Sequence, residues 1–281
     1  MKYGITQWSY PGNGIYAMKF VAQAGYDGMQ IELGDYTNGY YLQYKQMQEI
    51  YLEEAERYSL EFPSIVFNDM MRIGFLGPKD HDEYKITIDA IDLCLSVADQ
   101  MKIDTVMLPS FFATHIETDD DLARTAEVLK DTCVKAQKYG ITVETETTLS
   151  AEKQIEMMNI VDMQNLTYFY DSQNLCWFDG YSQTEILTKM LPYMGKQLHL
   201  CDGFGFYKDN NPEGTCPNGG SILGTGESDF FGQMKILGEN KFDGWLIVEN
   251  AYWRPPLYYQ GNPFDLAKKD LDIIKQVVSA W

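Results

Sequence analysis

Positive charge and long apolar runs are both scarce in this sequence. It has 22 lysines and arginines against 41 aspartates and glutamates, which gives a formal net charge of −19. A strongly acidic surface repels phosphate backbones and anionic membrane faces. No apolar run approaches the ~18–20 residues that a membrane span needs. The composition therefore argues against nucleic-acid and membrane partners.

Paired cysteines are also missing. No two cysteines form a CxxC motif, and the five are widely separated: Cys94, Cys133, Cys176, Cys201 and Cys216. The first residues, MKYGITQWSY, have the pattern of a strand and lack the apolar region of a signal peptide. We therefore expect a cytoplasmic protein whose thiols are reduced.

The sequence does contain a regular alternation of strand and helix patterns. We expect strands at 2–8, 28–33, 61–67, 104–109, 141–147, 165–171, 196–202 and 244–250. An expected helix follows each strand, at 15–25, 41–60, 84–101, 120–140, 151–161, 183–194, 229–240 and 263–280. Acidic or hydroxyl residues often open these helices, and glycine often closes them.

Repeated βα units over about 250 residues are typical of a (β/α)8 barrel. We therefore predict an α/β fold, a (β/α)8 TIM barrel, in a single domain that spans residues 1–281. An open doubly wound sheet is the competing layout, but it usually carries a glycine-rich phosphate turn, and GTGES at 224–228 lacks that spacing. Residues 203–226 have no periodicity, and a loop of this length is typical of a lid or a binding loop.

Four expected strands, the fifth to the eighth, carry charged or imidazole side chains at or near their ends. In strand order these residues are Glu146, Asp171, His199 and Glu249. A barrel places the carboxyl ends of its strands around one mouth, so we expect the four side chains to meet. Without a cation between them they would repel or stay protonated. They suit a divalent ion such as Mn²⁺, Mg²⁺, Co²⁺ or Zn²⁺, and the absence of a thiolate among them argues against a structural zinc site.

Each of these residues also has a simpler interpretation. Asp171 could cap a turn, and His199 could be a core histidine bonded to the backbone. Glu144 shares a strand face with Glu146, because residues two apart point the same way. That face could be exposed. If it is inward, Glu144 lies one layer lower, either buried and protonated or paired within the barrel.

The order of the motifs GITVETE, YFYD, LHLCD, LGTGESDF and IVEN resembles the xylose isomerase-like TIM barrel superfamily. The similarity is strongest to its sugar isomerase/epimerase group, which includes D-tagatose and D-psicose 3-epimerases and inosose-pathway isomerases. The resemblance spans the whole chain. It implies that one divalent metal is held by Glu146, Asp171, His199 and Glu249, and that the two glutamates form an acid/base pair.

The resemblance also implies a mechanism. The metal would bind a carbonyl and a neighbouring hydroxyl of a sugar and stabilise the enediolate that forms when a proton leaves the adjacent carbon. Glu146 and Glu249 would lie on opposite faces of the sugar, one taking the proton and the other returning it. Return to the same carbon gives epimerisation, and return to its neighbour gives aldose–ketose isomerisation. The sequence leaves both outcomes open.

Several positions depart from the ketose 3-epimerases. Asn174 stands where they carry a substrate-binding histidine, and Gly205 stands where they carry an arginine. Glu152 does match their second glutamate, six residues after Glu146. Many relatives carry a lysine at the position of Cys201. The ketose specificity therefore does not transfer to this chain.

Other residues near expected strand ends are candidates for substrate binding. Trp8 could stack on a sugar ring or pack in the core, and Asn68 could hydrogen-bond sugar hydroxyls. Few basic residues flank the expected mouth, which favours an unphosphorylated sugar, but Arg254 could bind an anionic group. Asp202 could support His199 or merely begin the long loop.

Four functions compete at this point. A metal-dependent sugar isomerase or epimerase is the first, and a lyase, dehydratase or sugar-conjugate cleaving enzyme of the same superfamily is the second. An endonuclease IV-like nuclease is disfavoured, because that family uses many more histidines than the three found here and the net charge is −19. A non-catalytic sugar-binding barrel is disfavoured by the intact set of four ligands. Relatives often form dimers or tetramers, so a homo-oligomer is possible.

Overall fold

The structure, a computed structural model, describes residues 1–12, 14–204 and 220–281. The strands are β1 (Lys2–Thr6), β2 (Gly28–Glu32), β3 (Ile65–Val66), β4 (Thr105–Ser110), β5 (Thr142–Thr147), β6 (Leu166–Asp171), β7 (Met194–Leu200) and β8 (Trp245–Val248). Neighbouring strands follow chain order, and β8 pairs in parallel with β1. They form a closed barrel, which confirms the predicted fold class.

Helices follow the strands along the chain. They are α1 (Ile15–Ala24), α2 (Lys45–Tyr58), α3 (Met70–Ile73), α4 (Asp82–Met101), α5 (Asp119–Ala136), α6 (Ala151–Val161), α7 (Asn174–Asp179), α8 (Gln183–Met190), α10 (Phe230–Glu239) and α11 (Pro263–Val278). Sequence analysis did not predict α3 and α7. With 4 and 6 residues, they are too short to show a helical period.

Prolines account for two differences in element length. The expected strand 61–67 is only Ile65–Val66, and Glu61 joins the sheet through an isolated bridge to Gly28. Pro63 lies between Glu61 and Ile65, and it has no N–H to donate to a neighbouring strand. The expected helix 183–194 ends at Met190, where a 3₁₀ turn that contains a proline leads directly into β7.

The chain divides into two compact units. The first unit comprises Met1–Gln30, Glu54–Glu61 and Tyr170–Trp281, and the second comprises Ile31–Glu53 and Phe62–Phe169. The boundaries fall inside β2, inside α2, between Glu61 and Phe62, and inside β6, so neither unit is one continuous stretch of chain. The expectation of a single domain over 1–281 stays a prediction.

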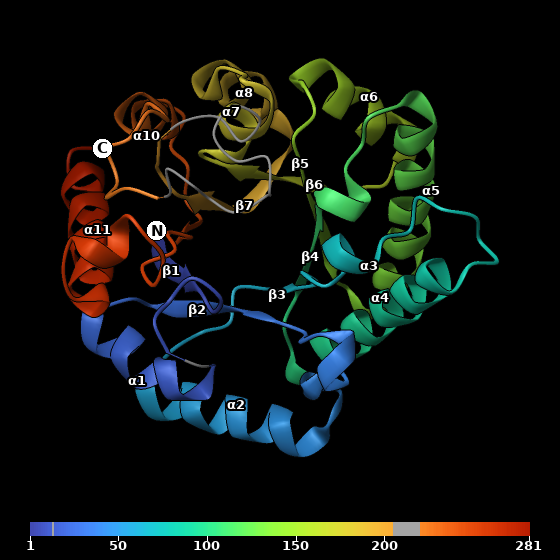
Figure 1. Cartoon of the computed structure of the whole chain (residues 1–281), viewed down its shortest axis with the longest axis horizontal. Helices are drawn as coiled ribbons and strands as arrows, with labels where there is room; N and C mark the ends of the chain where they lie inside the picture. Colours follow the sequence, from blue (N-terminus) through green and yellow to red (C-terminus); the bar gives the residue numbers. More distant parts are fainter. Residues whose placement is uncertain (13, 205–219) are drawn as a thin grey trace. The chain divides into compact units, whose positions relative to one another are not determined.

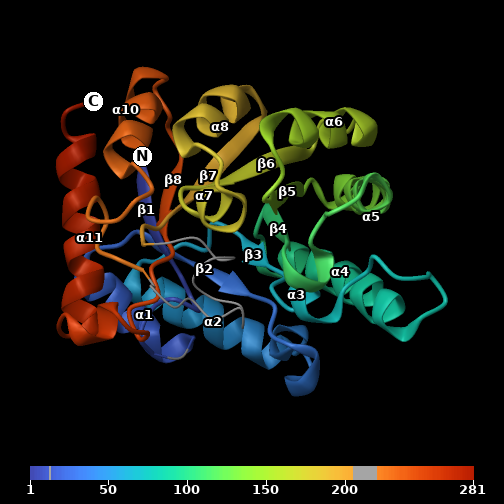
Figure 2. The same ribbon diagram turned by 45° about the horizontal axis from the view of Figure 1, so that its top comes forward.

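The first unit packs α10 and α11 side by side, at the red end of the colour scale in Figures 1 and 2. Asn262 caps α11 by accepting a hydrogen bond from the Phe264 N–H at 3.0 Å. The buried Tyr26 hydroxyl donates to the Ala267 carbonyl at 2.7 Å, which ties α11 to the turn before β2. Helix α11 is therefore fixed to the segment between α1 and β2.

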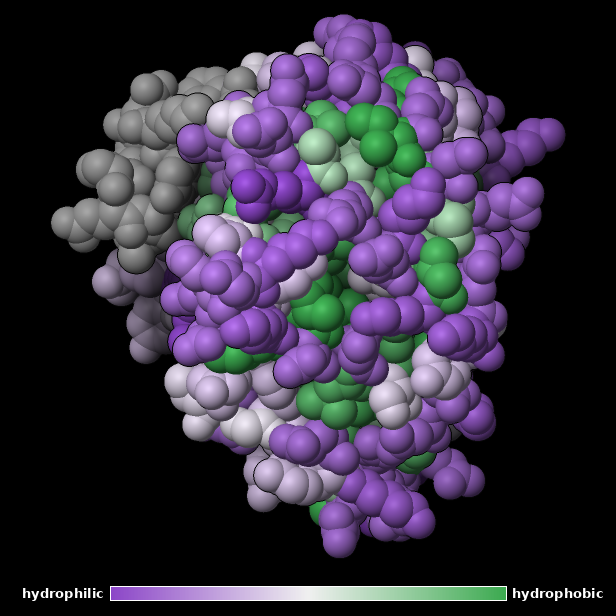
Figure 3. All heavy atoms as spheres, turned by 90° about the vertical axis from the view of Figure 1, so that its right-hand side faces the viewer, coloured by the Kyte–Doolittle hydropathy of each residue, from purple (hydrophilic) through white to green (hydrophobic). Residues whose placement is uncertain are grey.

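The second unit packs α5 against α6, which lie side by side in Figures 1 and 2. Helix α5 begins with a capping box, in which the Thr118 hydroxyl accepts from the Asp121 N–H and the Asp121 carboxylate accepts from the Thr118 N–H. Figure 3 shows the face at the right of Figure 1, which carries α4 and α5. Hydrophilic residues cover most of that face, and hydrophobic residues gather in small patches.

Among the described residues, no helix is both long enough and apolar enough to span a membrane.

Candidate metal centre

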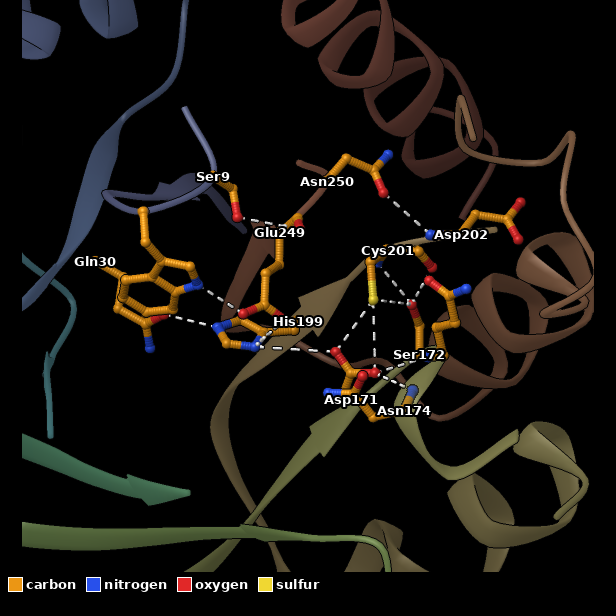
Figure 4. Close-up of polar contacts among 12 residues, drawn as sticks. Ser9, Gln30, Asp171, Ser172, Asn174, His199, Cys201, Asp202, Glu249 and Asn250 are labelled. Atoms are coloured by element: carbon orange, nitrogen blue, oxygen red, sulfur yellow. Dashed lines mark hydrogen bonds and ion pairs between the residues drawn. The ribbon is translucent and has the colours of Figure 1, made fainter. Parts of the chain in front are cut away.

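Three of the predicted ligands meet in the first unit, at the carboxyl ends of β6, β7 and β8 (Figure 4). Asp171 is the last residue of β6, His199 is the penultimate residue of β7, and Glu249 directly follows β8. The Nδ1 atom of His199 lies 3.0 Å from Glu249 Oε2 and 3.9 Å from Asp171 Oδ2. The strand ends thus place one imidazole between two carboxylates.

A buried glutamine orients the imidazole. His199 Nε2 lies 2.6 Å from Gln30 Oε1, and both side chains are completely buried. When Nε2 carries the proton and donates it to this oxygen, Nδ1 is left to face the carboxylates. Sequence analysis missed Gln30, because a neutral amide inside a strand carries no signal of its own.

The two carboxylates are held in different ways. Trp8 Nε1 donates to Glu249 Oε1 at 2.8 Å, so Trp8 lies beside the cluster. Asp171 Oδ1 accepts from the backbone N–H groups of Gln173, at 2.7 Å, and Asn174. Asn174, a candidate substrate contact, thus lies beside Asp171 at the start of α7.

These surroundings shift the pKa values of the carboxylates in opposite directions. Burial, and then the negative charge of Glu249, raise the pKa of Asp171 to about 6. Burial also acts to raise the pKa of Glu249, but the electrostatic interaction with His199 and the hydrogen bond from Trp8 outweigh it, so the pKa is lowered. At neutral pH, Glu249 is therefore ionised.

A thiol joins this cluster. The buried Cys201 S–H donates to Asp171, with Sγ 3.2 Å from Oδ2, and ligand atoms of Asp171, Cys201 and Glu249 all lie within 4.8 Å of one another. The four predicted ligands include no sulfur, so sequence analysis missed this donor. The sequence does hold one indication of this position. Cys201 follows His199 by two residues, and side chains two apart on a strand point the same way. Burial and the neighbouring carboxylates raise the pKa of the thiol well above its usual range.

Ser172 joins the ends of β6 and β7 behind the cluster. Its Oγ accepts from the Cys201 N–H at 2.7 Å and donates to the Cys201 carbonyl at 2.6 Å. The buried Gln183 of α8 donates through Nε2 to the Asp171 carbonyl at 3.0 Å. The buried Gln233 of α10 donates in the same way to the Ser172 carbonyl at 3.0 Å. These hydrogen bonds fix the backbone that carries the side chains of Asp171 and Cys201.

Asp202 holds the two sides of the long segment that follows β7. Its buried carboxylate accepts from the N–H groups of Gly203, Gly224, Gly226 and Ser228 and from the Ser228 hydroxyl, at 2.8–3.2 Å. A Cβ at position 226 would lie 2.3 Å from Asp202 Oδ1, so only glycine fits there. These contacts favour the second interpretation of Asp202, as the base of the loop. Gly205 and the rest of 205–219 lie outside the described residues.

Asn250, the residue after Glu249, connects the cluster to α11. Its Nδ2 donates to Asp270 Oδ2 at 2.7 Å and to the Ser221 carbonyl at 2.9 Å. Its Oδ1 accepts from the Asp202 N–H at 3.2 Å. One buried amide thus joins the segment after β8 to the base of the long loop.

Asp270, on α11, supplies the carboxylate that binds Asn250. It also accepts hydrogen bonds from the Tyr252 hydroxyl at 2.5 Å and the Leu223 N–H at 2.9 Å. Burial raises the pKa of Asp270 to about 6, although these hydrogen bonds oppose the shift.

The fourth predicted ligand, Glu146, is buried near the end of β5 in the second unit. Glu144 is buried as well, and its Oε2 atom has no hydrogen-bond partner among the described residues. Burial and the charge of Asp104 raise the pKa of Glu144 well above its usual range, which favours the buried and protonated alternative. Glu152 lies exposed in the first turn of α6.

Two further candidates lie at other loops. In the second unit, Asn68 Nδ2 donates to Glu32 Oε2 at 3.3 Å, so the pair spans the ends of β2 and β3. In the first unit, the Arg254 guanidinium stacks on Trp253 with Cζ 4.2 Å from the ring centroid, and Trp253 Nε1 donates to the Trp8 carbonyl at 3.0 Å. Arg254 is exposed and lies beside residues that reach the cluster.

Two proteins of named activity are similar in sequence to this chain, one along most of its length and the other along less than half of it. A 2-epi-5-epi-valiolone 7-phosphate 2-epimerase from an Actinoplanes species is 21% identical over 250 residues, which are 89% of this chain and 87% of that protein. An inosose dehydratase from Clostridium botulinum is 30% identical over 139 residues, which are 44% of this chain and 42% of that protein.

A solved structure and a family model agree with the fold. The crystal structure of the IOLI protein with a bound zinc atom superposes with a TM-score of 0.77 at 17% identity, covering 100% of this chain and 99% of that one. The model of the xylose isomerase-like TIM barrel family matches residues 18–277. The chain therefore belongs to the xylose isomerase-like TIM barrel family.

Proposed function

We propose that this protein is a sugar isomerase or epimerase that depends on a divalent metal. The observation that carries the proposal is the cluster of the buried Asp171 and His199 with the partly buried Glu249, in which His199 Nδ1 lies 3.0 Å from Glu249 Oε2. Its carboxylate and imidazole donors suit Mn²⁺, Mg²⁺, Co²⁺ or Zn²⁺. Epimerase relatives and the zinc-containing IOLI structure support the same assignment.

Glu146 is proposed as the fourth ligand and as the second member of the acid/base pair. It is buried near the end of β5, the strand position that the family resemblance assigns to this role. Its assignment rests on that position and on the resemblance.

A divalent ion bound here would act as a Lewis acid and stabilise negative charge on substrate oxygens. The protein residues supply the proton transfer. Glu249 is ionised at neutral pH and accepts a carbon-bound proton on one face of the substrate, and Glu146 exchanges a proton on the other. Trp8 holds Glu249 Oε1, while Gln30 fixes the ring of His199.

The substrate is proposed to be a small sugar or polyol. Asn68, Glu152, Asn174 and Trp8 offer amide, carboxylate and aromatic groups for its hydroxyls and ring. Arg254 offers one positive charge, which suits a substrate with a single anionic group. We further propose a cytoplasmic protein that forms a homo-oligomer and binds neither nucleic acid nor membranes.

Dehydration is the second candidate reaction, and the similarity to an inosose dehydratase favours it. It would use the same proton abstraction by Glu249, followed by loss of a hydroxide from the next carbon. The two reactions differ in their products, since only dehydration removes water.

The test measures metal content and proton exchange in the same samples. Wild type, His199→Ala and Glu249→Gln are analysed by elemental mass spectrometry and incubated in D₂O with free ketoses, aldoses and inososes. We expect near-stoichiometric metal in wild type and its loss in His199→Ala. We also expect deuterium at one sugar carbon with wild type and none with Glu249→Gln.

Failure to take up metal under every loading condition would overturn the proposal. Deuterium exchange that persists in Glu249→Gln would remove the acid/base role of that residue. A dicarbonyl product that has lost one water, in place of an epimer, would establish dehydration.

A further inference from the structure

We propose that Cys201 is a thiolate ligand of the same ion, and that the site therefore takes a thiophilic metal such as Zn²⁺ or Co²⁺ in preference to Mg²⁺ or Mn²⁺. This inference rests on the proposed function, because it needs a metal at the cluster. It adds a donor that the four predicted ligands do not include.

The position of Cys201 follows from the strand before it. Residues two apart on a strand point the same way, so Cys201 continues the inward face that carries His199. Its Sγ lies 3.2 Å from Asp171 Oδ2 and 3.5 Å from Oδ1. Ligand atoms of Asp171, Cys201 and Glu249 all lie within 4.8 Å of one another, close enough to share one ion.

The backbone of Cys201 is held in place. Ser172 Oγ bonds both its N–H and its carbonyl, at 2.7 and 2.6 Å. The residue is 6% exposed, so the thiol is shielded from most solvent. The S–H group is directed at Asp171, a proposed metal ligand. An ion bound to Asp171 would therefore meet the sulfur without any movement of the strand end.

A sulfur donor changes which metals the site selects. Carboxylates and imidazole alone accept a wide range of divalent ions, whereas a thiolate favours zinc and other soft or borderline ions. The thiol proton would pass to solvent as the ion binds.

The experiment uses the full chain, stripped of metal and reloaded with Co²⁺. A thiolate bound to Co²⁺ gives a charge-transfer band in the near ultraviolet. We expect this band in wild type, its loss in Cys201→Ser, and its retention in Cys133→Ala, which removes a buried thiol from α5. Far-ultraviolet circular dichroism confirms that each variant is folded.

A competition titration separates a ligand from a residue that only positions Asp171. We expect Cys201→Ser to weaken Zn²⁺ binding by at least about tenfold and Mn²⁺ binding by less than about threefold. If Cys201→Ser weakened Zn²⁺ and Mn²⁺ binding equally, or if wild type bound Co²⁺ without the charge-transfer band, the proposal of a thiolate ligand would be overturned. The proposal of a metal centre would still stand. Absence of bound metal in wild type would overturn both proposals.

Discussion

Gln30 carries no charge and no reactive atom, yet it controls which nitrogen of His199 faces the carboxylates. Its Oε1 lies 2.6 Å from Nε2, inside the barrel wall where water cannot replace it. Outer partners of this kind fix the tautomer and direction of a metal-binding imidazole. The direction of the imidazole therefore depends on a neutral side chain outside the carboxylate cluster.

Replacing Gln30 with leucine is expected to lower metal affinity by about 10–100-fold, because the imidazole loses the acceptor that orients it. Gln30→Glu keeps an acceptor at the same place and is expected to retain more of the affinity. A chelator competition assay measures both variants. Equal loss in the two would show that packing, not the hydrogen bond, decides the affinity.

At the scale of elements, α11 acts on the site through a single buried side chain. Asp270 binds Asn250, which lies between Glu249 and the base of the segment held by Asp202. The three partners of Asn250 (Asp202, Ser221 and Asp270) are all buried, so none of these bonds is exchanged easily for water. The helix thus fixes the backbone immediately after Glu249.

Asp270→Asn is expected to flatten the pH dependence of stability between about pH 4 and pH 6. Folding raises the pKa of Asp270 from the model value 3.8 to about 6, so in this range the folded chain keeps a proton that the unfolded chain releases. The contribution is fully present below the lower value and is lost as the pH rises through the upper one. Linkage sets it at roughly 3 kcal/mol.

Urea unfolding of metal-free protein at a series of pH values measures this effect. The control is Asp265→Asn, which changes an exposed aspartate in the first turn of the same helix. We expect the wild-type and Asp265→Asn curves to run parallel and the Asp270→Asn curve to diverge. If the free energy of unfolding changed with pH in the same way in all three proteins, the raised pKa of Asp270 would be contradicted.

At the scale of the whole molecule, the cluster joins the ends of three strands that are consecutive in the barrel. An ion that binds only the folded chain stabilises it by about 2.7 kcal/mol when its concentration is 100 times Kd. We therefore expect chelation to lower the Tm by several degrees in wild type, as measured by differential scanning calorimetry. His199→Ala should show no such response, and an equal drop in that variant would place the ion elsewhere.

The barrel and much of its site could be predicted because they depend on patterns that are visible along the chain. Asp171 and Glu249 stand out as charges that close apolar strands, and strand ends meet in any barrel. Gln30 does not stand out, since a neutral amide is ordinary inside a strand, and Cys201 offers only its two-residue spacing from His199. The contact between Asn250 and Asp270 joins residues 20 positions apart, and only the fold brings them together.

The carboxylate of Asp202 has a consequence for how this protein can change. It accepts hydrogen bonds from the N–H of Gly203 on one side of the long segment and from the N–H groups of Gly224 and Gly226 on the other. Its two oxygens therefore hold both sides. A single substitution at Asp202 would therefore release Gly203, Gly224 and Gly226 together. This position is far less free to vary than an ordinary loop residue, because one carboxylate serves several backbone N–H groups at once.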